Sequence, residues 1–385
     1  MKIESSVVFQ DRHRYAMGPS MVIVPGGDLV LAFNMTTMRE LSAHSPRQWL
    51  HPPYDPEYRN MMIRSSDGGR SWSAPRPFPD HDWHGTECPG LGVLADGHLL
   101  ASVYRRVFLT AEAAAARKDL VGALPRHPYP WTNAHGGTYV HRSADGGLTW
   151  AQSVEVGTGP YISGYSNRGV VELADGTLLL PLAAADPFYD TYCKEDLFWA
   201  GDALGNERNP DGSVRVGKSA AFVAISTDGG LSWNATREIA RDPEVNFFEP
   251  AMARLRSGRL LCHLRSCVEG GDHLYQVASD DGGLSWGEPW RTPIWGFPAQ
   301  VLQLPDGRVL SIYGHRRPPF GIRACASDDE GRTWDIRREI VVRDDLPNAN
   351  LGYPTAVVLE SGDVFTVYWG EEKGVTSLLG SRFAP

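Results

Sequence analysis

The sequence predicts an all-β protein, a six-bladed β-propeller of four-stranded antiparallel blades whose last blade is closed by the N-terminal strand. Three observations predict it, namely two internal repeats and one strand-like run at the start of the chain. Repeats at regular spacing are typical of proteins that use one structural unit several times. The first repeat, Ser-x-Asp-x-Gly-x-Ser/Thr-Trp, occurs at residues 65–72, 143–150, 226–233, 279–286 and 327–334.

The second repeat is a short turn between two apolar runs. Its six copies contain Gly-Gly, Asp-Gly or Ser-Gly and cover residues 24–29, 94–99, 173–178, 255–260, 304–309 and 359–364. Glycine adopts positive φ at little cost, and tight hairpins require such residues. Each turn therefore predicts a β-hairpin, and each hairpin except the last is followed by one Ser-x-Asp repeat.

Each unit thus supplies four strands in chain order. The glycine hairpin provides strands 1 and 2, and the Ser-x-Asp repeat marks the turn between strands 3 and 4. The sixth unit, from Leu351 to the end, has no Ser-x-Asp repeat. The run at residues 3–9 reads as a strand that completes this unit and closes the ring. One propeller then accounts for residues 1–385 as a single domain.

The composition excludes several classes of function. The net charge is −9 and no basic run occurs, which argues against a nucleic-acid partner. No apolar stretch approaches the length of a membrane span. The start Met-Lys-Ile-Glu-Ser-Ser lacks the apolar region of a signal peptide, which predicts a cytoplasmic protein unless a signal has been removed. Five cysteines without Cys-x-x-Cys spacing predict reduced, mostly buried thiols, and the oligomeric state stays open.

The functional site is expected on the face opposite the two sets of turns. The segment from hairpin glycine to repeat serine has 21 residues from Gly258 to Ser279, but 50 from Gly176 to Ser226. Blades 1, 2 and 3 therefore carry insertions between strands 2 and 3, and long loops on one face of a rigid scaffold usually build a binding site. The second insertion includes a predicted short helix at residues 111–120. Alternatively, the aromatic residues of these loops pack against the propeller.

The five Ser-x-Asp copies resemble the Asp-box, or BNR, repeats of the sialidase superfamily. The resemblance covers nearly the whole chain and implies the propeller fold more strongly than an activity. It also implies a structural role for the repeats themselves. Their Asp residues are expected to cap turns through backbone N–H groups, and their Trp residues to pack between blades.

Aligning the blades on their hairpins gives one equivalent residue at the entrance of each innermost strand. These residues are Gly18, Cys88, Asn167, Glu249, Pro298 and Tyr353. They are expected to surround a central funnel on the face without the turns. The pair of Glu249 and Tyr353 resembles the base and nucleophile of sialidase-type glycosidases. A neutral Tyr suits an anionic sugar, because a carboxylate nucleophile would be repelled by it.

The segments at residues 249–265 and 352–354 are similar to the Glu…Arg and Tyr segments of sialidases. The resemblance implies that Arg265 and Arg323 clamp a substrate carboxylate, since arginine forks match carboxylates bidentately. Arg316 or Arg317 could replace Arg323. The best match to the acid/base of the family is Asp55, with Glu57 next.

The chain departs from the family in blade 1, where Met17 stands in the place of the first clamp arginine. Arg12 and Arg14 are the nearby alternatives. This departure puts sialic acid itself in doubt but leaves an acidic or uronic sugar as the expected ligand.

Blades 2 and 3 add polar residues that a plain sialidase pattern does not explain. Further substrate contacts are expected from Glu87, Arg106, His135 and Arg168, and His84, His263, His273 and His315 lie near the same rim. No metal-ligand spacing occurs, so neither a metal nor a cofactor is assigned.

Three functions follow from these observations. The first is a retaining exo-glycosidase of sialidase type for a carbohydrate with a carboxylate. The second is a propeller hydrolase or lyase for a uronic acid that uses the His and Glu residues of blade 2. The third is a glycan-binding module without catalysis, in which Glu249 merely neutralises Arg265 and Tyr353 packs in the funnel.

Overall fold

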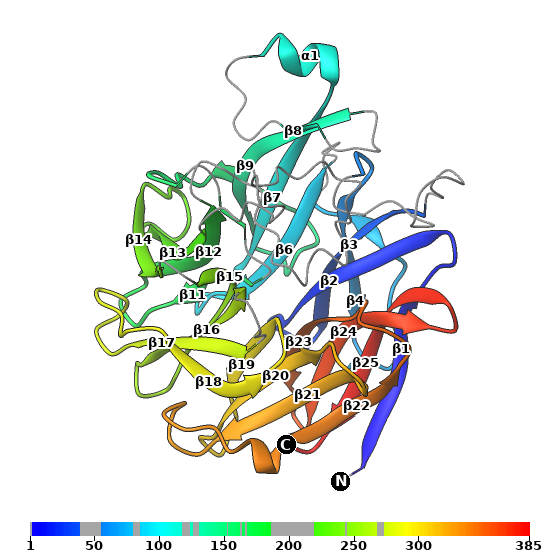
Figure 1. Cartoon of the computed structure of the whole chain (residues 1–385), viewed down its shortest axis with the longest axis vertical. Helices are drawn as coiled ribbons and strands as arrows, with labels where there is room; N and C mark the ends of the chain where they lie inside the picture. Colours follow the sequence, from blue (N-terminus) through cyan, green and yellow to red (C-terminus); the bar gives the residue numbers. More distant parts are fainter. Residues whose placement is uncertain are drawn as a thin grey trace, which may run out of the picture.

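The computed structural model of the chain shows six antiparallel sheets of mainly four strands, arranged around a common centre (Figure 1). It describes residues 2–38, 55–79, 85–117, 124–125, 131–151, 153–161, 164–165, 168–185, 219–242, 245–267 and 273–385. The predicted six-bladed β-propeller is confirmed. In the first five blades, chain order runs from the innermost strand to the outermost strand.

The strands of the six blades follow, each blade from inside to outside. Blade 1 has β2 (Arg14–Ile23), β3 (Leu29–Thr37), β4 (Arg59–Ser65) and β5 (Arg76–Pro77); blade 2 has β6 (Thr86–Val93), β7 (Leu99–Thr110), β9 (Trp131–Ser143) and β10 (Val154–Glu155), with β8 (Leu124–Pro125) beside β9; blade 3 has β11 (Val171–Glu172), β12 (Leu178–Ala185), β13 (Ser219–Ser226) and β14 (Ala235–Ala240). Blade 4 has β15 (Asn246–Arg254), β16 (Leu260–Cys267), β17 (His273–Ser279) and β18 (Trp290–Trp295); blade 5 has β19 (Ala299–Gln303), β20 (Val309–His315), β21 (Phe320–Ser327) and β22 (Ile340–Leu346); blade 6 has β23 (Gly352–Val358), β24 (Val364–Glu372), β25 (Val375–Phe383) and β1 (Ile3–Gln10).

Within the described residues, two short helices lie outside the sheets. The helix α1 (Ala111–Ala115) begins after Thr110, whose side-chain oxygen accepts a hydrogen bond from the N–H of Ala113. It ends five residues before the predicted boundary at residue 120, and residues 118–120 lie outside the described part. The 3-10 helix η3 (Ile336–Arg338) precedes β22. Among the described residues, no helix has the length and apolar character needed to cross a bilayer.

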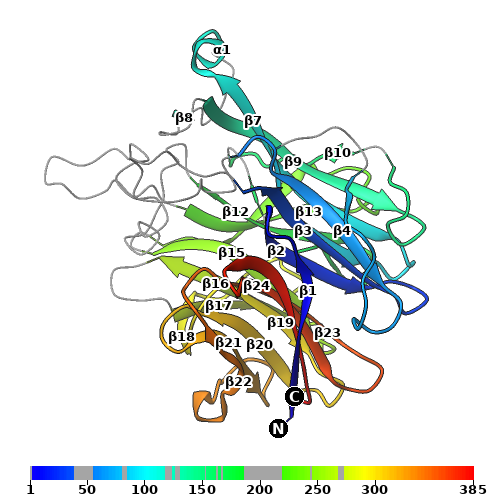
Figure 2. The same ribbon diagram turned by 90° about the vertical axis from the view of Figure 1, so that its right-hand side faces the viewer.

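The two ends of the chain meet in blade 6. Strand β1 pairs antiparallel with β25 from Ile3, opposite Phe383, to Gln10, opposite Ser377. Figures 1 and 2 show the N- and C-termini close together at the same end of the molecule. The N-terminal strand is therefore the outermost strand of the last blade, as the sequence predicts.

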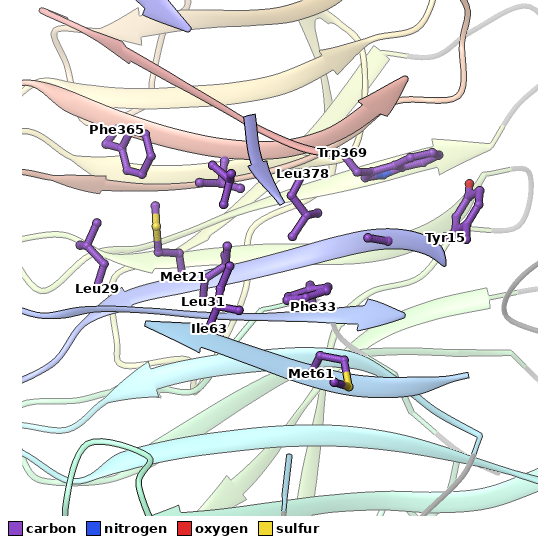
Figure 3. Packing of buried hydrophobic residues seen from close by; sticks show 13 residues of the cluster. Tyr15, Met21, Leu29, Leu31, Phe33, Met61, Ile63, Phe365, Trp369 and Leu378 are labelled. Carbon is purple, nitrogen blue, oxygen red and sulfur yellow. The ribbon is translucent and has the colours of Figure 1, made fainter. Parts of the chain in front are cut away.

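The hydrophobic core lies between neighbouring blades. Successive side chains of a strand point to opposite faces. Leu29, Leu31 and Phe33 of β3 pack against blade 6 (Figure 3). Val30 and Ala32 of the same strand pack against blade 2. Among the described residues, a buried apolar cluster joins each blade to the next around the ring. These clusters make the ring a rigid support for side chains at the strand ends.

The Ser-x-Asp turns have the structural role that the sequence predicts. In blade 2, Asp145 Oδ1 accepts hydrogen bonds from the backbone N–H groups of Leu148 and Thr149 at 2.9 Å and from the Ser143 hydroxyl at 2.7 Å. The hydroxyl bond from the first serine, at 2.7 Å, recurs in the other four turns. The tryptophan of each turn packs toward the preceding blade, as Trp150 does against Phe78 with ring centroids 5.0 Å apart.

Replacing Asp228 by Ala is expected to lower the free energy of unfolding by about 1 kcal/mol near neutral pH, as the loss of a side-chain cap does. Hydrogen bonds from Ser232 and Ser226 lower the pKa of Asp228 to about 2. Because this value is below the unfolded pKa of about 3.9, the stabilisation is present above about pH 4 and is lost as the pH falls toward 2. Urea unfolding at about pH 7 and about pH 3 should show a smaller difference between the two proteins at the lower pH. An equal difference at both values would contradict this role of the carboxylate.

Candidate functional site

Glu249 in β15 and Tyr353 in β23 meet at the centre of the propeller. Both residues have a left-handed backbone conformation, with φ of 48° and 52°, and each lies where the register of its strand shifts at a β-bulge. The Tyr353 hydroxyl donates a hydrogen bond to Glu249 Oε1. Left-handed conformations of residues other than Gly are costly and persist where the surrounding structure imposes them, often at functional sites. The predicted meeting of these two residues is thus present in the structure.

The same bulge occurs in other blades at the positions that the hairpin alignment made equivalent. Gly18 in β2 has φ of 61° and lies at a shift of register, and β6 has a bulge at Cys88. Asn167 lies outside the described residues. The same β-bulge therefore recurs with different side chains. Among the described residues at these aligned positions, the left-handed residues with an ionisable side chain are Glu249 in blade 4 and Tyr353 in blade 6.

Arg265 holds the Glu249 carboxylate from the neighbouring strand. It lies in β16 opposite Phe248, and its Nη1 is 3.2 Å from Glu249 Oε1 and 3.4 Å from Oε2. The two side chains are only 9% and 7% exposed. The Arg265 guanidinium also lies 4.3 Å from the centroid of the Phe297 ring. The carboxylate therefore receives hydrogen bonds from both a phenol and a guanidinium.

Arg316, which follows β20, also lies near Tyr353. Its Cζ atom is 5.8 Å from the centroid of the Tyr353 ring and 4.9 Å from that of Phe297. Phe297 is thus within cation–π distance of both Arg265 and Arg316. Sequence reasoning did not single out Phe297, although it stands just before Pro298, the aligned position of blade 5.

Arg168 reaches the same place from blade 3. Its Nε and Nη2 donate to the carbonyl of Ala299 at 3.1 and 2.7 Å, and Nη2 also donates to the carbonyl of Pro354 at 3.0 Å. Burial lowers the pKa of Arg168 to about 10, while the nearby Glu249 and Tyr353 act in the opposite direction. The sequence predicts that Arg168 contacts the substrate. In the structure, its Nε and Nη2 atoms instead donate hydrogen bonds to the backbone of blades 5 and 6.

Tyr353 keeps its proton at neutral pH. Burial raises the pKa of its hydroxyl well above the usual value of a phenol, and the negative charge of Glu249 raises it further. Arg265 and Arg316 act in the opposite direction. The group is therefore a neutral phenol whose proton is already directed at a carboxylate, which is the arrangement that a nucleophile with a general base requires.

Arg323 in β21 is held elsewhere in blade 5. Its Nη1 donates to the carbonyl of Arg343 at 2.6 Å, and its Nε lies 3.6 Å from Glu339 Oε2. Tyr313, which faces Arg323 across the β20–β21 pair, donates its hydroxyl to the same carboxylate of Glu339. The structure thus engages Arg323 with the outer part of its own blade and not with Tyr353.

Arg317 lies at the rim and is exposed. Its guanidinium stacks on Trp295 at 4.0 Å from the ring centroid, and its Nε donates to His315 at 3.3 Å. Of the three arginines considered for blade 5, Arg316 is the one that the structure places beside Tyr353.

A second polar group lies in blade 2. Arg106 donates to Glu87 Oε1 from Nε at 2.8 Å, and its Nη2 is 2.7 Å from the same oxygen. Tyr104, which faces Glu87 across the β6–β7 pair, is hydrogen-bonded through its hydroxyl to His135 Nδ1. Burial raises the pKa of Glu87, and Arg106 opposes the rise. The ring of Tyr165 lies 6.3 Å from that of Tyr104.

Tyr165 connects this group to the centre. It packs against Phe248, the residue before Glu249 in β15. The predicted binding residues Glu87, Arg106 and His135 therefore lie together. Two aromatic contacts, Tyr104–Tyr165 and Tyr165–Phe248, connect them to the strand that carries Glu249.

Asp55 lies at the start of a turn before β4 and is 1% exposed. Its Oδ1 accepts a hydrogen bond from the N–H of Glu57 at 2.8 Å. Most of the three insertions lies outside the described residues. Among the loop residues outside the described part are Trp49, His51, Tyr54, His127, Tyr129, Phe188, Tyr189, Asp190, Tyr192 and Trp199, whose residue types suit sugar recognition.

In the described part of blade 1, the residues beside the aligned position Gly18 are uncharged. Met17 pairs with Asn34 across β2 and β3. Arg14 is three residues further out and donates to Thr37 at 2.8 Å, while Arg12 donates to the neighbouring His13. The structure thus gives each of the two nearby arginines a partner close to its own strand end.

The described histidines near the rim, His263, His273 and His315, each have hydrogen-bond partners of their own. His263 is fully buried, its ring nitrogens lie 3.0 Å from Ser311 and Gln276, and burial lowers its pKa to about 4. His273 contacts a backbone carbonyl of β18, and His84 lies outside the described residues. Within the described part of the chain, no group of three His, Cys, Asp or Glu side chains has the geometry of a metal site.

A cavity of about 120 Å³ lies among the innermost segments. Residues from all six blades line it, including Ser20, Leu91, Arg168, Met252, Gln300 and Thr355. Since these residues follow the aligned positions in each strand, the cavity lies on the hairpin side of the Glu249–Tyr353 pair. Arg168 lines this cavity and also interacts with the Glu249–Tyr353 pair.

Comparisons with known proteins agree with this architecture. Residues 120–366 match the family described as BNR repeat-like domain. No curated protein matches the chain. A crystal structure of a protein of unknown function from Dyadobacter fermentans is similar over 99% of this chain and 98% of that chain, with 27% identity and a TM-score of 0.80.

Two more distant structures share the fold. The NanB sialidase from Streptococcus pneumoniae is 14% identical, with a TM-score of 0.60 over 98% of this chain and 70% of that chain. An α-L-arabinofuranosidase from Fusarium graminearum is 13% identical, with a TM-score of 0.61 over 99% of this chain and 97% of that chain.

Proposed function

The chain belongs to the family of BNR repeat-like domains, and from this premise we propose that it is a glycoside hydrolase for a sugar that carries a carboxylate. The observation that carries the proposal is the hydrogen bond from the Tyr353 hydroxyl to Glu249 within a cluster of arginines. Tyr353 is the nucleophile, Glu249 is its base, and Arg265 and Arg316 bind the substrate carboxylate.

The proposed reaction has two displacement steps. In the first step, the Tyr353 oxygen forms a bond to the anomeric carbon, the glycosidic C–O bond breaks, and Glu249 takes the phenolic proton. Asp55 gives a proton to the leaving oxygen in this proposal. In the second step, water attacks the anomeric carbon and Asp55 takes a proton from that water. The bond between the anomeric carbon and the Tyr353 oxygen breaks, and this oxygen recovers its proton from Glu249. The sugar leaves with its original anomeric configuration.

The charge of the cluster supports an acidic substrate. Three arginines, Arg168, Arg265 and Arg316, interact electrostatically with the Glu249–Tyr353 pair. Arginine forks bind carboxylates with two parallel hydrogen bonds. Because Met17 occupies the place of a first clamp arginine, the proposed clamp has two members, and either a sialic or a uronic acid fits this description.

A second candidate function rests on the hydrogen bond between Tyr104 and His135. A tyrosine and a histidine in contact could exchange a proton with the carbon next to a uronic carboxylate, and Arg106 beside Glu87 would lie near that carboxylate. Such a lyase would release an unsaturated sugar that absorbs in the ultraviolet.

Turnover of fluorogenic glycosides tests the proposal. We expect the protein to hydrolyse at least one sialoside, glucuronide or galacturonide with a kcat/KM about 100-fold or more above that of the matched glucoside or galactoside. The reason is that a neutral sugar offers no carboxylate for Arg265 and Arg316 to bind. Hydrolysis of neutral glycosides alone would refute the acidic substrate. An ultraviolet-absorbing product without hydrolysis would favour the lyase.

A further inference from the structure

Arg168 crosses the centre of the propeller. It precedes the innermost strand of blade 3. Its guanidinium nevertheless binds the backbone carbonyls of Ala299 in blade 5 and Pro354 in blade 6. The residue is 9% exposed. It therefore ties three separate blades together at the level of the Glu249–Tyr353 pair.

The chemistry of this position calls for an arginine. A guanidinium is planar and has five N–H donors in fixed directions, so one group can bind two carbonyl oxygens at once. Burial of a cation is costly unless a counter-charge and hydrogen bonds accompany it. Here the two carbonyls supply the hydrogen bonds, and Glu249 supplies the nearby negative charge.

The bond to Pro354 acts on the residue before it. Tyr353 has a φ of 52°, a conformation that most side chains avoid. The carbonyl that Arg168 binds belongs to the next residue of the chain, in the same β-bulge. A fixed Pro354 carbonyl leaves Tyr353 little freedom to return to an extended backbone, which would turn its hydroxyl away from Glu249.

We propose that Arg168 is a positioning residue for the Tyr353–Glu249 pair: it holds the β-bulge of Tyr353 through the Pro354 carbonyl and places a fixed positive charge beside the pair. Substrate carboxylate is left to Arg265 and Arg316. The sequence analysis expected Arg168 to bind the substrate directly, and the role proposed here is a different one. The kinetic part of the test rests on the proposed function, whereas the spectroscopic part does not.

A matched control exists on the opposite face. Arg256, in the hairpin turn of blade 4, also binds two backbone carbonyls of the next blade, those of Leu304 at 2.8 Å and Pro305 at 3.1 Å. Arg256 is exposed whereas Arg168 is buried, so Arg256→Met controls for the loss of two inter-blade hydrogen bonds and not for burial. Any effect shared by Arg168→Met and Arg256→Met therefore reports only the loss of contacts between blades.

The kinetic experiment compares kcat and KM on the acidic glycoside that the wild-type protein turns over best. We expect Arg168→Met to lose about 30-fold or more in kcat with a change in KM of less than about threefold, because misplacement of a nucleophile slows the chemical step. Arg168→Lys keeps the charge but not the fork, so it should recover part of kcat. Arg256→Met should keep wild-type kcat. A rise in KM with unchanged kcat in Arg168→Met would instead assign Arg168 to substrate binding.

The spectroscopic experiment uses 3-fluorotyrosine incorporated at position 353. Its ¹⁹F resonance, and the pH at which that resonance titrates, should change in Arg168→Met and to a smaller extent in Arg168→Lys, but not in Arg256→Met. Besides Arg168 itself, the charged groups that face this ring are Glu249, Arg265 and Arg316, and all three variants retain these three groups. An unchanged resonance and titration in folded Arg168→Met and Arg168→Lys would overturn the proposal. If no glycoside is turned over, the proposed function fails while this measurement still decides the role of Arg168.

Discussion

The variant Tyr353→Phe is expected to fold like the wild-type protein and to lose about 100-fold or more of its turnover of acidic glycosides. The change keeps the aromatic ring and the left-handed backbone and removes only the hydroxyl that donates to Glu249. Circular dichroism and thermal unfolding check the fold, and initial rates with a fluorogenic substrate measure the loss.

The chain offers a close control for this variant. Tyr313 is also buried and also donates its hydroxyl to a glutamate, Glu339, but it lies within blade 5. Tyr313→Phe removes the same type of bond and should keep full turnover per folded molecule. If Tyr353→Phe retained near wild-type turnover, Tyr353 would be a packing residue, and the reaction would have to be assigned to Tyr104 and His135 in blade 2.

The variant Arg265→Met is expected to lower the free energy of unfolding by about 3 kcal/mol, because it leaves the Glu249 carboxylate buried without its ion-pair partner. The double variant Arg265→Met/Glu249→Gln should recover part of this loss, since the uncompensated charge is then gone. Chemical denaturation of the single and double variants measures both effects.

Arg259→Met provides the comparison for a surface pair. Arg259 lies 2.6 Å from Asp280, whose side chain is 71% exposed, so its removal should cost about 0.5 kcal/mol or less. Equal losses in Arg265→Met and Arg259→Met would show that burial adds nothing to the Glu249–Arg265 pair. Strict additivity in the double variant would show that the two charges do not interact.

The two positions at the centre illustrate how a propeller can carry different chemistry on one backbone feature. The β-bulges of β2, β6, β15 and β23 occur at equivalent points. In blade 1 the bulge carries Gly18, whereas in blades 4 and 6 the left-handed residues are Glu249 and Tyr353. The rigid inter-blade clusters set the position of each bulge, so a change of side chain alters the chemistry without changing the ring.

The sequence by itself determined the ring of blades and the meeting of Glu249 with Tyr353. Both depend on local rules that repeat along the chain. Glycine turns define hairpins, Ser-x-Asp turns satisfy their own backbone, and apolar residues at every second position face a neighbouring blade. Once the blades are equivalent, residues at the same distance before each hairpin must surround the same centre, and that is why alignment alone brought these two side chains together.

Only the tertiary structure decided which arginine of blade 5 lies beside the Glu249–Tyr353 pair and which groups the other two arginines contact. Arg316, Arg317 and Arg323 lie at the same end of blade 5 and are alike in sequence terms. Their directions are set by local acceptors, namely Glu339 and a backbone carbonyl for Arg323 and Trp295 for Arg317.

The role of Arg168 is equally invisible in the sequence, because its partners Ala299 and Pro354 belong to other blades, more than 100 residues away. The physical reason is one of reach. Strand and turn preferences act over a few residues, whereas a long flexible side chain chooses among donors and acceptors that only the closed ring brings within hydrogen-bond distance.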